Sequence, residues 1–167
     1  MRGHDHHARS RAAISELGLP DAMDFNELVA FVEERRQTRI HFEETPELNG
    51  MKVCGVWTGD GRGNDYIYLP ADAKVEVKLF TCCHEFGHML GEPLHPETGP
   101  GTLPEIEEFL AGVINPERRV AYAYARSTFN DEKEAAAESL GDQLALRILR
   151  ARRRGQARGF RFERVFS

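Results

Sequence analysis

Residues 75–90 read VEVKLFTCCHEFGHML and carry apolar side chains at helical spacing. The apolar positions recur every three or four residues, at Val75, Leu79, Cys82, Phe86 and Leu90. This period places them on one face of an α-helix, and Gly91 and Pro93 predict where that helix ends. We therefore expect an amphipathic helix from about residue 75 to residue 91.

The centre of this predicted helix holds the motif His84-Glu85-Phe86-Gly87-His88. Two histidines four residues apart lie on the same helix face, about one turn apart, and can bind one Zn²⁺ together. Glu85 projects beside them, where a carboxylate can take a proton from an activated water. The motif predicts a hydrolytic zinc site with His84 and His88 as ligands and Glu85 as general base. The small Gly87 would let another helix approach closely.

Two histidines and a water leave such a site one protein ligand short. The last predicted helix offers Glu132, Glu134 and Glu138. Glu134 and Glu138 lie one turn apart, so one could bind the metal while the other accepts the outer N–H of a ligand histidine. His95, just past the motif helix, is a competing ligand. The spacing alone leaves these alternatives open.

The segments before the motif predict a helix followed by strands. Asp24 and Glu27 form a capping-box pattern, and helical spacing continues to about Arg36. Three stretches alternate or are rich in β-branched and aromatic residues, at residues 39–42, 53–57 and 65–69. The glycine-rich link between the second and third predicts an antiparallel hairpin.

The segments after the motif are predicted to be helical. One short helix is expected around residues 106–113, and a second is expected to begin at Pro116 and to carry Val120–Ala125. A long last helix is capped by Asn130 or Asp131. The predicted fold class is α+β, with a small antiparallel sheet packed on a helical half that carries the motif helix.

The length of 167 residues predicts one domain. We expect residues 1–20 to form a flexible arm with a short helix near residues 11–17. Residues 21–151 form the single predicted domain, and residues 152–167 form a basic tail.

Charge and composition narrow the function classes. The net charge is −5, but residues 150–167 hold seven Arg and one acid, so that segment carries +6 and the remainder carries −11. An acidic body argues against direct nucleic-acid binding. No apolar run approaches the ~20 residues of a membrane span. Three cysteines indicate free thiols in a reducing compartment, so the expected location is the cytoplasm.

The chain resembles the ImmA/IrrE family of small bacterial zinc metallo-endopeptidases, in its short actinobacterial form. The resemblance covers about residues 24–150. It rests on five stretches in order: residues 55–57, 66–68, 84–90 (HEFGHML), 126–129 and 134–138 (EAAAE). It implies a gluzincin-like fold, and it implies Glu134 as the third zinc ligand because Glu134 begins the family's Glu-x-x-Ala pattern.

The predicted function is a zinc-dependent endopeptidase that cleaves a specific partner protein. The resemblance implies a helix-turn-helix transcriptional repressor as that partner. We expect the substrate to dock extended against the strand at Tyr66–Leu69. The alternative is a non-cleaving, zinc-stabilised toxin or antirepressor component that binds a regulator, in which Glu85 would be dispensable.

Overall fold

The computed structural model describes residues 11–51, 55–91, 104–113, 118, 120, 122–125 and 131–155. After a short helix over residues 11–17, the named elements are α2 (Phe25–Arg36), β1 (Arg39–Thr45), the 3₁₀ helix η1 (Pro46–Leu48), β2 (Val56–Gly59), β3 (Asn64–Pro70), α3 (Val75–Gly91), α4 (Pro104–Val113), β4 (Tyr122–Ala125) and α5 (Asp131–Arg153). The predicted α+β class is confirmed. Among these helices, none is both long and apolar enough to cross a bilayer.

Local signals placed the helices well. α2 begins with the predicted capping box, in which Asp24 accepts from the Glu27 N–H and Glu27 accepts from the Asp24 N–H. α3 carries the whole motif from residue 84 to residue 88. The helix over residues 11–17 is present as well, and its Ile14 is buried in the main core. α5 extends to Arg153, so the first two residues of the predicted basic tail are helical.

The sheet differs from the predicted antiparallel one. Its strand order is β1-β3-β2-β4, and β2 and β3 form the expected antiparallel hairpin. However, β1 pairs with β3 in parallel, so the sheet is mixed. The hairpin folds β3 back into the space between β1 and β2. Two reversals of chain direction then leave β3 running the same way as β1.

Residues 122–125 form strand β4 and correct the helix predicted over Val120–Ala125. The segment Tyr-Ala-Tyr-Ala alternates large and small residues, which suits a strand as well as a helix over so short a length. β4 pairs antiparallel with β2, so Val56 lies opposite Ala125. Pairing with the edge of β2 favours the extended conformation of residues 122–125. The periodicity of the sequence does not show where such a strand edge lies.

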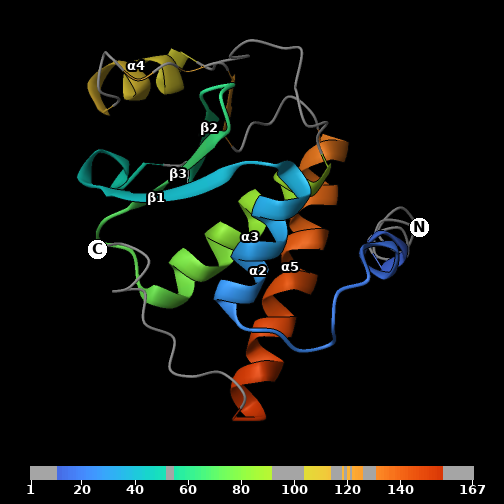
Figure 1. Ribbon diagram of the computed structural model, residues 1–167. Coiled ribbons are helices and arrows are strands. Elements are labelled where there is room, and N and C mark those ends of the chain that lie inside the picture. The colour runs from blue at the N-terminus through green and yellow to red at the C-terminus, as the bar shows by residue number, and fades with distance from the viewer. Residues whose placement is uncertain are drawn as a thin grey trace.

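The sheet lies between two helical layers (Figure 1). One face packs against α2, α3 and α5 around a large core, in which Trp57, Ile67, Phe86, Leu144 and Ile148 are buried. The other face contacts η1 and α4 through a smaller cluster of Leu48, Val56, Tyr68 and Phe109. The motif helix α3 is therefore held between the sheet and α5.

A buried polar cluster joins α2, the sheet and the end of α3. Arg36 is 2% exposed, and its Nε lies 3.3 Å from Asp65 Oδ2. Arg36 Nη1 also donates to the carbonyl of Met89 at 2.7 Å, in the last turn of α3. Asp65 accepts two further hydrogen bonds, from Trp57 Nε1 and Thr38 Oγ1. Several partners thus compensate most of the burial of both charges, although Arg36 Nη2 is buried without a hydrogen-bond partner among the described residues.

Candidate metal centre

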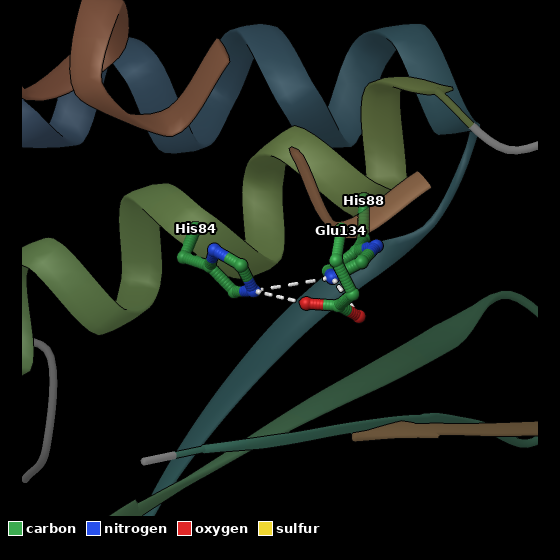
Figure 2. A group of neighbouring side chains, drawn as sticks. All are labelled: His84, His88 and Glu134. Atoms are coloured by element: carbon green, nitrogen blue, oxygen red, sulfur yellow. Dashed lines mark hydrogen bonds and ion pairs between the residues drawn. The ribbon is translucent and has the colours of Figure 1, made fainter. Parts of the chain in front are cut away.

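Three potential metal ligands meet where α3 and α5 cross (Figure 2). His84 and His88 project from α3, and Glu134 comes from the first turn of α5. The Nε2 atoms of His84 and His88 lie 3.2 Å apart. Glu134 Oε1 is 3.2 Å from His88 Nε2, and Glu134 Oε2 is 3.5 Å from His84 Nε2. This group of three residues could hold a metal ion.

The backbone brings the two helices into contact at this point. Gly87 lies between the two histidines, and a Cβ built on it would be 2.3 Å from the carbonyl oxygen of Ala137. A Cβ on Gly141 would lie 2.9 Å from the Cα of His84. Two glycines therefore permit the close helix approach that carries Glu134 to the histidines.

The carboxylate of Glu134 is stabilised in its charged form. Burial acts to raise its pKa, but hydrogen bonding and charge from His84 and His88 outweigh burial and hold the pKa at about 2. A side chain that stays ionised near two imidazoles is a suitable anionic ligand for a cation. Its Oε2 is buried and lies 3.5 Å from His84 Nε2.

Glu85 lies on the inner side of the same helix turn and is 1% exposed. Burial raises the pKa of its carboxyl, while the neighbouring histidines act in the opposite direction. Its Oε2 is buried, and no described group forms a hydrogen bond with it. A buried carboxylate with a free oxygen beside a ligand cluster has the chemistry of a proton acceptor.

A pocket of about 270 Å³ opens beside these residues. Its lining combines Glu85 and His84 with parts of α3, α5 and the residue before β2, namely Gly55, Val77, Phe80, Thr81, Glu138, Gly141 and Asp142. Gly55 has no room for a side chain, because its Cβ would lie 2.5 Å from Thr81 Cγ2 and 3.2 Å from Glu85 Oε1. Glu85 can therefore be reached from the pocket although it is buried.

The structure sorts the predicted ligands. It brings His84, His88 and Glu134 together, whereas Glu132 and Glu138 are exposed on α5. Glu138 lines the pocket next to His84, and its predicted support of a ligand histidine stays a prediction. His95 lies outside the described residues.

Sequence reasoning missed the pocket wall formed by Val77, Phe80 and Asp142. Exposed apolar residues at the start of α3 were the available signal, but nothing in their spacing relates them to α5. Cys82 is buried in the core, as its position on the apolar helix face predicted.

Comparison of the chain with protein-family models, with curated proteins and with solved structures gave no match.

Proposed function

We propose that this chain is a zinc-dependent endopeptidase that cleaves a specific partner protein. One observation carries the proposal: two histidines of one helix and a glutamate of a later helix converge beside buried Glu85, whose Oε2 has no hydrogen-bond partner among the described residues. The same arrangement supports the expected gluzincin-like fold, with the third ligand on a later helix.

The ligand spacing suits zinc. In a tetrahedral site with bonds of about 2.0–2.1 Å, neighbouring ligand atoms lie about 3.3 Å apart. The two Nε2 atoms are 3.2 Å apart, and each faces a different oxygen of Glu134, Oε1 at 3.2 Å from His88 and Oε2 at 3.5 Å from His84. One atom from each residue lies within 4.8 Å of the other two. Two imidazoles and one carboxylate are also the donor set of catalytic zinc sites, which keep the fourth position open.

Glu85 supplies the proton transfers. A zinc ion held by the three ligands supplies Lewis acidity, which polarises a peptide carbonyl and makes water more acidic. Glu85 Oε2 accepts a proton from the attacking water while the water oxygen bonds to the carbonyl carbon. Glu85 then donates that proton to the leaving nitrogen as the C–N bond breaks. Its burial keeps bulk water from competing for the same proton.

The expected docking strand needs correction. β3, which holds Tyr66–Leu69, pairs with β1 on one side and with β2 on the other, so it offers no free edge. Among the described strands, β1 and β4 form the two edges. β4 pairs with β2, whose preceding residue Gly55 lines the pocket at Glu85. We therefore place strand addition of the substrate at the β4 edge.

The partner class follows from the resemblance of residues 84–90 and 134–138 to the ImmA/IrrE family. It is a helix-turn-helix repressor, cut in a flexible loop that can enter the site as an extended chain. The cytoplasm, where such repressors act, is the proposed location. The pocket is small, so recognition also requires a folded part of the partner.

Cleavage of a candidate helix-turn-helix regulator tests the proposal, and any such regulator encoded beside this gene is the first candidate. Zinc-loaded wild type and Glu85→Gln are each incubated with the regulator, and intact masses are measured. We expect one cut by the wild type and none by Glu85→Gln, with about one zinc bound to each protein. A stable complex with the zinc-loaded wild type and no fragments would favour the non-cleaving alternative.

A further inference from the structure

The pocket beside the candidate metal centre has two chemically different walls. Val77 and Phe80, one turn apart on α3, form an apolar wall. Glu138 and Asp142, one turn apart on α5, form an acidic wall. Both walls lead to Glu85 and His84, where the proposed hydrolysis takes place.

The apolar wall is unusually open to solvent. Val77 is 48% exposed and Phe80 is 47% exposed, whereas Leu79, Phe86 and Met89 of the same helix are buried. Apolar surface left in water is unfavourable in free energy. An apolar group that enters the pocket would recover part of this energy.

The acidic wall consists of the carboxylates of Glu138 and Asp142. Like charges one turn apart weaken a helix slightly, so the placement of Glu138 next to Asp142 does not favour α5. The buried Glu85 adds a third carboxyl, with Oε2 free of hydrogen bonds to the described residues. No lysine or arginine is among the described residues that line the pocket. The pocket is therefore negative as well as partly apolar.

We propose that this pocket is a specificity subsite for an arginine or lysine side chain next to the scissile bond. The inference rests on the proposed peptidase function and names the substrate feature that it would select. The aliphatic stem would pack on Val77 and Phe80 while the cationic head lies against Asp142 and Glu138. A volume of about 270 Å³ is below the usual ~300–1,000 Å³ of small-molecule sites and suits a single side chain.

Binding to a protein that cannot cut tests the subsite. The probes are two eight-residue peptides that differ only in one central residue, arginine in one and its uncharged isostere citrulline in the other. Both are titrated calorimetrically into zinc-loaded Glu85→Gln. We expect the arginine peptide to bind about three- to tenfold more tightly, as partly exposed ion pairs allow.

Two further substitutions in the Glu85→Gln background separate the walls. Asp142→Asn should reduce the preference for arginine over citrulline to about twofold or less, without changing zinc content. Phe80→Ala should weaken both peptides by a similar factor, because the stem contact is common to them. Glu16→Gln, an exposed acid outside the pocket, is the matched control and should change neither affinity.

Equal affinities for the two peptides, or no measurable binding of either, would overturn the subsite. A dimer that light scattering detects and that Phe80→Ala abolishes would assign the apolar wall to a second copy of the chain, and would also overturn it. Failure of the peptidase proposal has a different signature: the wild type would cut nothing, while the preference for arginine would persist in binding.

Discussion

Replacing Gly87 by alanine tests whether close packing of α3 against α5 forms the metal centre. The added Cβ would lie 2.3 Å from the carbonyl oxygen of Ala137. Carbon–oxygen contacts in proteins begin near ~3.3 Å, so the helices must separate locally by about 1 Å. Both partners are backbone in helices, and no flexible side chain can move aside instead.

The cost of this separation falls on both stability and metal affinity. Overpacking of a well-packed interface costs ~1–3 kcal/mol, while alanine favours helix over glycine by up to ~1 kcal/mol. We therefore expect Gly87→Ala to lower the free energy of unfolding of the metal-free protein by ~1–2 kcal/mol. Moving Glu134 by about 1 Å would also lengthen ligand contacts that are now 3.2–3.5 Å. Zinc affinity should fall by at least the ~10–100-fold typical of indirect changes.

Denaturant titration and competition with a chromophoric chelator measure these two quantities. Gly112→Ala in α4 is the matched control, because no atom of the described residues lies within 4 Å of its added Cβ. It should leave zinc affinity unchanged and stabilise the fold slightly. If Gly87→Ala binds zinc as tightly as the wild type, the reasoning that helix contact positions Glu134 is refuted.

Three further experiments probe the rest of the structure. Glu134→Gln should weaken zinc binding far more than Glu138→Gln, for which the loss should not exceed ~10–100-fold, and the opposite order in a chelator competition would exchange their roles. Asp65→Asn should lower the free energy of unfolding by ~3–5 kcal/mol, because it leaves a buried arginine without its charge partner. Cys82 and Cys83 should resist brief N-ethylmaleimide treatment of the native protein, since burial raises the pKa of both thiols; peptide mass mapping that finds either one labelled would contradict this.

The fold was predictable where local interactions determine it. The capping box of α2, the span of α3 and the hairpin of β2 with β3 all follow from signals within a few residues. Two predictions were wrong: β1 pairs in parallel and not antiparallel, and residues 122–125 form strand β4 and not a helix. Both depend on which strand edge is free, and a sheet edge is a property of the assembled fold.

The candidate site divides in the same way. The spacing of His84 and His88 alone places both imidazoles on one helix turn, because helix geometry makes residues four apart neighbours. Glu134 is 46 residues further along the chain from His88, and its spacing allowed Glu132 and Glu138 as alternatives. Only the packing of α5 against α3, which Gly87 and Gly141 permit, brings the Glu134 carboxylate to the histidines. The same packing forms the pocket beside them. Contacts between distant helices depend on how side chains from the whole chain fill the core, and no local spacing encodes that.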